Sequence, residues 1–538
     1  MSGKESYDID EIRKMISAIR TDDHNVRLNA LSNLHLIAKV LGPERTRTEL
    51  IPYTIETTDH NPHDLSIIGE ELGKLLNDVG GPSHIKILLE ALRTLCENED
   101  ILIREPATDS IVKLGKLLTK SEYGVITQFA KDLCEDTWYP LRCSGACVCC
   151  ELYHYFPDSV LKEIDQELAS LAGDQMVMVR RSLAKSIPSL IKSERNSVQL
   201  ASNIIKALSS DESAAVAIEI PISISLLASS APDVALSVSE KIYKSDIWQA
   251  KSVLISYLDR IFKNNPPKEF LKQVVNSSLI DGANVIRASI ARQIPFIYES
   301  KCLSFDEFQQ FVMSLISDSE SCVRLAVASS LGKMPSTKKG NFDESSITTL
   351  LNDEELDVRM EALSSVAISG KAISSASKNL TDLIKFSNWR IKKGVADLLP
   401  KISNIFDEKR FNNEMVPIVK SLLSDEASEV RQEIARILVS LVKKYGEKWE
   451  KTILFPILQE LFESPDYMLR KTGIEAVSAI SCFDQFKDTL EKLCSDPCPN
   501  VRMVLARNLP RNSSLLDKLK KDEDIDVKDC ANSSNKQH

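Results

Sequence analysis

The hydrophobic and polar positions of the chain follow a helical period that restarts every few tens of residues. In one stretch Val323, Ala326, Val327 and Leu331 recur at offsets of three and four residues, and Val430–Leu441 repeats the spacing. Such spacing places the apolar side chains on one face of a helix. The pattern therefore predicts many short amphipathic helices.

Each amphipathic run follows a recurring element, in which an acidic residue and a short polar stretch precede an apolar residue and a base. Where no copy is skipped, successive bases lie about 26 to 39 residues apart, the length of two short helices and their turns. Eight copies keep a strict spacing of six from acid to base: Asp136–Arg142, Asp174–Arg180, Asp281–Arg287, Asp318–Arg324, Asp353–Arg359, Asp425–Arg431, Asp496–Arg502 and Asp522–Lys528.

This repeat predicts the fold class. One pair of short helices cannot bury its apolar face alone, whereas pairs stacked side by side can. We therefore predict an all-α fold, an elongated and curved α-α superhelix (a solenoid) that runs as a single array over residues 1–538. An Asp at the start of a second helix accepts the free amides of its first turn. The Asp and Arg rows thus predict caps and ion pairs between repeats, along an edge where solenoids also bind partners.

The motif Asp-x4-Val-Arg at the start of a second helix resembles the HEAT repeat. The order of landmarks resembles one HEAT family in particular, the scaffold (A, 65-kDa regulatory) subunits of protein phosphatase 2A. The resemblance covers residues 10 to about 530 and implies about 15 repeats, followed by a polar tail at 531–538. The landmarks are Val26–Leu31, Gly42–Pro52, Val79–Gly81, Val179–Arg181, Asn388–Ile391, Lys443–Trp449, Asp466–Arg470, Asp496–Arg502 and Asp522–Lys528.

The resemblance implies a non-catalytic scaffold that bridges exchangeable regulatory B-type subunits and the catalytic subunit of a serine/threonine phosphatase. It places about eight N-terminal repeats, residues 10–300, on the regulatory side and repeats 11 to 15, residues 385–530, on the catalytic side. The implied catalytic-subunit-binding residues are Trp389, Arg390, Tyr467, Arg470, Asn500, Arg502, Asp524 and Asp526. The implied regulatory-subunit-binding residues are Glu99, Asp100, Trp138, Asp174 and Asp211.

Three positions on the regulatory side depart from the family pattern. Ala217 stands where the sixth repeat has its base, and Gln175 replaces an acid in the fifth repeat. Gln249 follows Trp248 where the family usually has Arg. These changes put in question whether the altered repeats keep regulatory-subunit contacts.

Three of the four tryptophans, Trp138, Trp248 and Trp389, lie in the turn before a second helix. A ring there either plugs the gap between neighbouring repeats or anchors an interface, since Trp and Arg dominate binding hot spots. For Trp389 and Arg390 the resemblance favours contact with the catalytic subunit.

Composition supports a helical protein without a nucleic-acid role. The chain is 43% hydrophobic and 27% charged, with only 17 Gly and 21 Pro among its 538 residues. Scarce glycine argues against a turn-rich sheet fold and against glycine phosphate loops. The formal net charge is −10 and the bases are interleaved with acids, whereas phosphate backbones require clustered Lys and Arg. We expect no nucleic-acid partner.

The chain also carries no pattern for export or membrane insertion. Met1–Asp10 is polar and acidic, which predicts no signal or transit peptide. The most apolar long stretch, Ala214–Val238, contains Glu219, Pro221 and Asp233, which are incompatible with a membrane span. The 12 cysteines are then expected as reduced thiols. We expect a cytoplasmic protein, with the nucleus as a second location, and no membrane partner.

Catalytic chemistry has little support. No histidine lies between His154 and His538, so most of the chain lacks the commonest base and metal ligand, and no nucleotide-binding or nucleophile motif occurs. Cys143, Cys147 and Cys150 share a helical face with His154, but the four span about 16 Å, too far to share one Zn²⁺. We predict packing thiols, with a redox role as the smaller alternative, and no enzyme activity, metal site or cofactor.

One other function remains open, that of an importin-like nuclear transport receptor, which is also an acidic HEAT solenoid. Such a receptor is normally longer and carries an acidic insert for basic cargo. No such acidic run exists in this chain, so the scaffold is the preferred hypothesis.

Overall fold

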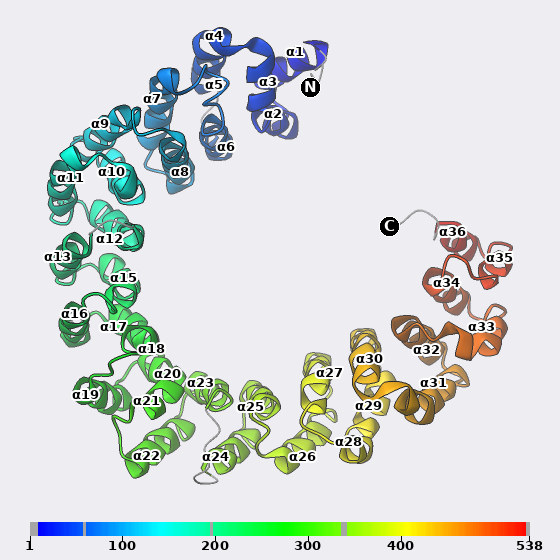
Figure 1. Cartoon of the computed structure of the whole chain (residues 1–538). Coiled ribbons are helices and arrows are strands. Elements are labelled where there is room, and N and C mark those ends of the chain that lie inside the picture. Colours follow the sequence, from blue (N-terminus) through cyan, green and yellow to red (C-terminus); the bar gives the residue numbers. More distant parts are fainter. Residues whose placement is uncertain (1–8, 57–60, 194–196, 335–341, 534–538) are drawn as a thin grey trace. The chain divides into compact units, whose positions relative to one another are not determined.

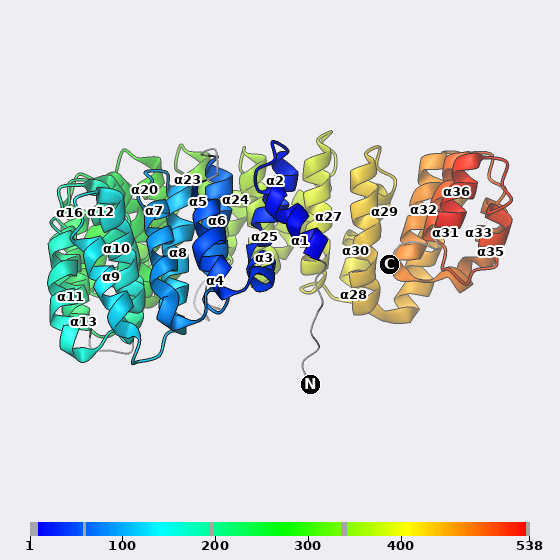
Figure 2. The same cartoon turned by 90° about the horizontal axis from the view of Figure 1, so that it is seen from above.

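The computed structural model describes residues 9–56, 61–193, 197–334 and 342–533, and every regular element in these ranges is a helix. Contacts divide the chain into two compact units, Met1–Val274 and Val275–His538. Within each unit successive helices stack side by side, with their turns gathered at two edges (Figures 1 and 2). The predicted all-α solenoid class is confirmed.

Short helices make up the first unit. They are α1 Ile9–Ala18, α2 His24–Leu31, α3 Leu34–Leu41, α4 Pro43–Arg45, α5 Ile51–Glu56, α6 Pro62–Leu72, α7 Ile85–Cys96, α8 Ile101–Leu117, α9 Tyr123–Cys134, α10 Tyr139–Leu152, α11 Asp158–Leu171, α12 Val177–Lys192, α13 Val198–Leu208, α14 Ala214–Ala217, α15 Ile220–Leu227, α16 Pro232–Lys244, α17 Trp248–Ser256 and α18 Leu258–Ile261. Helix α19, Lys268–Leu279, contains the division between the units.

The second unit continues the alternation. Its helices are α20 Asn284–Arg292, α21 Ile294–Ser300, α22 Phe305–Ile316, α23 Ser321–Leu331, α24 Phe342–Leu351, α25 Leu356–Ser369, α26 Ile373–Leu383, α27 Trp389–Ser403, α28 Glu408–Glu414, α29 Val416–Leu423, α30 Ser428–Trp449, α31 Phe455–Phe462, α32 Tyr467–Ile480, α33 Lys487–Leu493, α34 Pro499–Asn508, α35 Leu515–Leu519 and α36 Ile525–Ser533.

The repeat α22–α23 shows why these sequences form paired helices. Ser304 and Glu307 close a reciprocal capping box at the start of α22, which satisfies two otherwise free amides. The predicted apolar stripe of α23 is buried, from Val323 to Leu331. Each further repeat covers such a stripe, so burial of apolar surface stabilises the stack one neighbour at a time.

Small residues allow close packing around α10. A Cβ at Gly145 would lie 2.8 Å from the Cys134 backbone nitrogen, so the residue must be glycine for α9 and α10 to approach this closely. Cys143 and Cys150 are buried, which agrees with the prediction of packing thiols. His154, expected on the same face, instead lies exposed in the short 3₁₀ segment Tyr153–Tyr155.

The C-terminal boundary differs from the expectation. The predicted polar tail at 531–538 is helical as far as Ser533, because Val527 and Ala531 of α36 are buried. Residues 534–538 lie outside the described part. Among the residues that the structure describes, no helix combines the length and apolar character that crossing a bilayer requires.

Candidate functional site

The turns that precede the second helices are joined by ion pairs, which we call the Asp–Arg ladder. In one rung Arg324 donates from Nε to Asp353 at 2.7 Å and from Nη2 at 3.0 Å, while its Nη1 donates to the Asp318 carbonyl at 2.8 Å. Asp353 also accepts the amide of Glu355 at 2.9 Å. One guanidinium thus ties its own turn to the turn of the next repeat, and only 7% of Arg324 is exposed.

The rung recurs in both units. Six rungs are bidentate, with Nε–Oδ2 distances of 2.5–2.7 Å: Arg142–Asp174, Arg180–Asp211, Arg287–Asp318, Arg324–Asp353, Arg470–Asp496 and Arg502–Asp522. Single bonds of 2.7 and 2.8 Å form the equivalent contacts Lys392–Asp425 and Arg27–Asp64. The predicted caps and inter-repeat ion pairs are confirmed.

Among the described residues the ladder is interrupted at several positions, and three of them show different causes. Ala217 is 6% exposed and offers no cation. Arg431 reaches the Thr472 hydroxyl at 3.0 Å because Ser464 stands six residues before Arg470, where other repeats have an acid. Another interruption is at Arg359, whose guanidinium lies over the ring of Phe386 at 5.8 Å.

The rungs perturb the ionisation of their carboxyl groups. Hydrogen bonding from Arg502 holds the pKa of Asp522 below its usual range. At Asp174 and Asp318, burial alone would raise the pKa of the carboxyl, but bonds from the arginine and from a backbone amide outweigh it and lower the pKa. Charge-assisted, bidentate bonds of this kind are the stronger ones in proteins.

We predict that stability falls as the pH drops below about 4, the ordinary pKa of an unfolded Asp. The rung carboxyls titrate lower in the folded chain than in the unfolded chain. Their contribution is therefore complete above the unfolded pKa and is lost as the pH falls through the folded pKa. Urea unfolding at a series of pH values checks this. An unfolding free energy that stays constant from pH 6 to pH 3 would contradict it.

The residues implied for catalytic-subunit binding divide into two groups. Trp389 begins α27 half-buried, and the exposed Arg390 stacks 4.7 Å above its ring. Tyr467, Asn500 and Asp526 are also exposed at the starts of their helices. All of these side chains can reach a partner.

The other three members are already engaged within the chain. Arg470 and Arg502 are rungs of the ladder, and the Asp524 side chain accepts amides of the first turn of α36. Whether they also contact a partner stays a prediction.

The residues implied for regulatory-subunit binding divide in the same way. Glu99 is exposed, and Trp138 is 42% exposed with its indole N–H donating to the Glu97 carbonyl at 2.7 Å. Asp100 caps α8 through the Leu102 amide at 2.9 Å. Asp174 and Asp211 are rung carboxylates.

The structure adds apolar residues that the sequence analysis missed at this edge. Leu102 is 65% exposed, Ile101 is 42% and Met176 is 39%, in turns that neighbour the turn of Trp138. The available signal was an apolar residue in the first turn of a second helix, outside the buried stripe. Exposed apolar groups rimmed by acidic side chains are typical of protein-binding surfaces.

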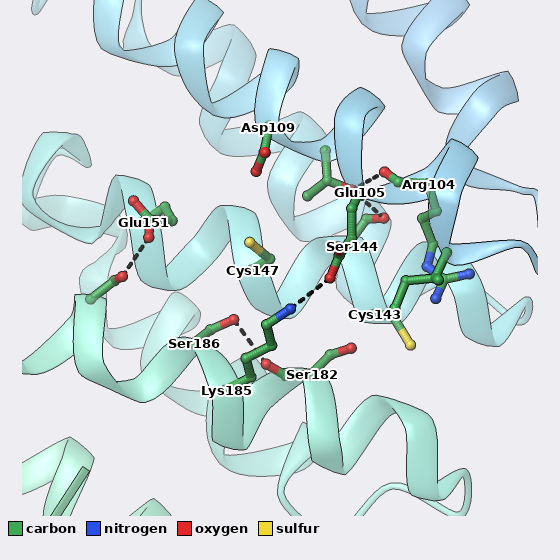
Figure 3. A pocket seen from close by; sticks show the side chains of 13 residues that line it. Arg104, Glu105, Asp109, Cys143, Ser144, Cys147, Glu151, Ser182, Lys185 and Ser186 are labelled. Carbon is green, nitrogen blue, oxygen red and sulfur yellow. Dashed lines mark hydrogen bonds and ion pairs between the residues drawn. The ribbon is translucent and has the colours of Figure 1, made fainter. Parts of the chain in front are cut away.

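A second feature is a polar hollow of about 280 Å³ lined by α8, α10 and α12 (Figure 3). Small side chains of α10 leave the space, and Lys185 bridges it to Glu105 at 2.6 Å. Burial raises the pKa of the Cys147 thiol to about 12, which makes it a poor nucleophile. Within the described ranges no three His, Cys, Asp or Glu side chains are placed to hold a metal ion.

Comparison with known sequences confirms the predicted resemblance. The chain is 34% identical over 179 residues to the regulatory A subunit of protein phosphatase PP2A from Schizosaccharomyces pombe. It is 33% identical over 198 residues to the protein phosphatase 2A scaffold subunit of Dictyostelium discoideum. A HEAT-repeat family described as "Stalled ribosome sensor GCN1, HEAT repeats" matches residues 283–472. The alignments with the two relatives span 33% and 36% of this chain, and 30% and 34% of the relatives.

Comparison with solved structures concerns the fold alone. Yeast importin-β matches with a TM-score of 0.61 at 12% identity, covering 97% of this chain and 76% of that one. A second importin-β structure, crystallised in ammonium sulfate, gives 0.56 at 13% identity, covering 97% of this chain and 76% of its own. Both agree with a HEAT-type solenoid.

Proposed function

We propose that this HEAT-repeat chain, related in sequence to the scaffold subunits of protein phosphatase 2A, is a non-catalytic scaffold of such a phosphatase. It bridges exchangeable regulatory B-type subunits and the catalytic subunit. The observation that carries the proposal is the turn of Trp389 and Arg390, where the exposed Arg390 guanidinium stacks over the half-buried Trp389 ring at the start of α27. Trp and Arg are the commonest anchors of protein interfaces.

The ladder gives this scaffold a physical mechanism. Each rung fixes the two turns that it joins against each other, so exposed residues of those turns are presented at fixed spacing. A partner then binds without first ordering these turns, which lowers the entropic cost of association. Holding two subunits on one chain raises the effective concentration of substrate-binding surface beside the phosphatase.

No specific observation favours the importin-like alternative. The importin-like structures share only 12–13% identity with the chain, which supports a common fold and no common partner. The relatives at 33–34% identity are named as regulatory or scaffold subunits. We also propose that the protein works in the cytoplasm, with the nucleus as a second location.

The proposal is tested by titrating a purified phosphatase 2A catalytic subunit with the purified chain and measuring their dissociation constant. A scaffold binds at a ratio of one to one without hydrolysing a phosphopeptide by itself. A chain that captures a Ran-type GTPase and ignores the phosphatase would instead support the importin-like alternative.

On the regulatory side, we predict that Glu99→Lys weakens binding of a B-type subunit several-fold at low salt and spares the catalytic subunit. Glu99 is exposed, and rim charges act mainly on association rate and salt dependence. The melting temperature should not change. The matched control is the neighbouring Asp100→Ala, which removes the cap of α8 and should cost about 1 kcal/mol of stability. Equal loss of both partners in Glu99→Lys would contradict the assignment.

A further inference from the structure

One base of the ladder differs from the others in its contacts. Each bidentate arginine rung places its guanidinium between at least one carbonyl of its own turn and the Asp of the next repeat, and Arg324 bonds two such carbonyls. Six residues before Lys392, where that Asp would stand, the chain has Phe386. Arg359 therefore meets an aromatic ring in place of a carboxylate.

With Phe386 in place of an Asp, the guanidinium of Arg359 lacks a hydrogen-bond acceptor in the described part of the chain. Among the described residues the Arg359 guanidinium has no hydrogen-bond partner, and its Nε is buried without one. The nearby carboxylate of Asp382 is instead bonded to Lys385 at 3.0 Å, and this bond is the main cause of the lowered pKa of Asp382. A half-buried guanidinium without an acceptor is costly, and it is an unused site for a carboxylate.

The surroundings of Arg359 fit a docking surface. Phe386 is 40% exposed and lies three residues before Trp389, so two aromatic rings, each with a guanidinium over it, occupy the same turn. Beside them an open hollow of about 480 Å³ is lined by Met360, Asn388 and Arg390, among others. Three of its lining residues are acidic, Glu354, Glu355 and Asp357, and Glu354 faces Arg324 at 3.3 Å.

We infer that Arg359 and Phe386 extend the docking surface of Trp389 and Arg390 by one repeat toward the N-terminus. In the complex, Arg359 binds a carboxylate side chain of the phosphatase catalytic subunit, which takes the place of the missing Asp of the rung. Phe386 packs against apolar atoms of the catalytic-subunit segment that carries this carboxylate. This inference rests on the proposed function. It adds one recognition residue, Arg359, that lies outside residues 385–530, the range implied for the catalytic subunit.

The first test measures affinity and stability on the same full-length variants. Arg359→Ala should weaken catalytic-subunit binding about tenfold, the effect of one charge-assisted contact, and should not lower the melting temperature of the free chain. Phe386→Asp supplies the carboxylate in cis, so it should also weaken binding but raise the melting temperature. Wild-type affinity in Arg359→Ala, or a loss of stability as large as that of Arg324→Ala, would overturn the inference.

The second test identifies the partner group. In Arg359→Lys the ammonium can be coupled by a water-soluble carbodiimide to a carboxylate in contact with it, which forms an amide with loss of water. We expect a crosslinked peptide that joins residue 359 to an Asp or Glu of the catalytic subunit. Crosslinks to carboxylates of this chain alone would contradict the inference.

Failure of the inference and of the proposed function can be told apart. A wild-type chain that does not bind the catalytic subunit overturns both. Binding that is lost in Trp389→Ala but kept in Arg359→Ala overturns the inference alone.

Discussion

Replacing Trp389 and Arg390 together by alanine is expected to reduce the affinity for the catalytic subunit by about a thousandfold, or roughly 4 kcal/mol. The indole is half-buried at the start of α27 and the guanidinium is stacked 4.7 Å above it, so the double variant removes one compact anchor. The fold should persist, because Trp389 and Arg390 lie in a turn outside the buried stripe of α27 and Arg390 is exposed.

Affinity by titration calorimetry and the melting temperature, taken on the same preparation, measure this effect. The matched control is Trp138→Ala, a tryptophan at the equivalent turn of the regulatory side, which should leave catalytic-subunit binding intact. If the double variant binds like the wild type, the residue assignment is wrong even though the relationship to the scaffold subunits stands. Loss of binding together with a lowered melting temperature would show that the pair is structural.

The second large effect concerns the ladder itself. Arg324→Ala should cost about 3–5 kcal/mol, because it leaves the carboxylate of Asp353 buried without its partner. Both side chains of this rung are 8% exposed. Since solenoid repeats contact only their neighbours, hydrogen exchange should accelerate in α23 and α25 and much less in α34 and α36.

Two control variants distinguish the loss of this rung from a non-specific loss of stability. Lys385→Ala breaks a solvent-exposed pair with Asp382 and should cost less than about 1 kcal/mol. The double variant Arg324→Met with Asp353→Leu removes both charges, so it should recover much of the lost stability. A loss no larger than that of Lys385→Ala would mean that the rung does not stabilise the stack.

The ladder was predictable from sequence because acid and base recur six residues apart and each amphipathic run follows in a helical period. The sequence does not show which charged residues form ion pairs within the ladder and which remain available to a partner. Arg and Asp are also common in protein interfaces, so the residue types of Arg470 and Asp174 do not distinguish a rung from a partner contact. Which of the two each side chain makes depends on where the neighbouring repeat places its turn in three dimensions. The structure places both within rungs and leaves Arg390 and Glu99 exposed.

The position of Phe386 shows a related limit. The landmark Asn388–Ile391 begins two residues after Phe386, so the sequence pattern does not show that Phe386 stands where other repeats have the acid. Only the contact of Arg359 with the ring reveals the exchange. Likewise, the exposure of Leu102 and Met176 depends on where each second helix begins, which a hydrophobic period fixes only to within a residue or two.

The central claim is that one chain holds two different subunits together, and reconstitution with both partners tests it most directly. The purified chain is mixed at equal concentration with a phosphatase 2A catalytic subunit plus a B-type subunit, and the masses of the complexes are measured by native mass spectrometry. The account predicts a heterotrimer with one copy of each protein, which forms only when the chain is present. Two separate binary complexes without a heterotrimer, or a phosphatase pair that excludes the chain, would contradict it.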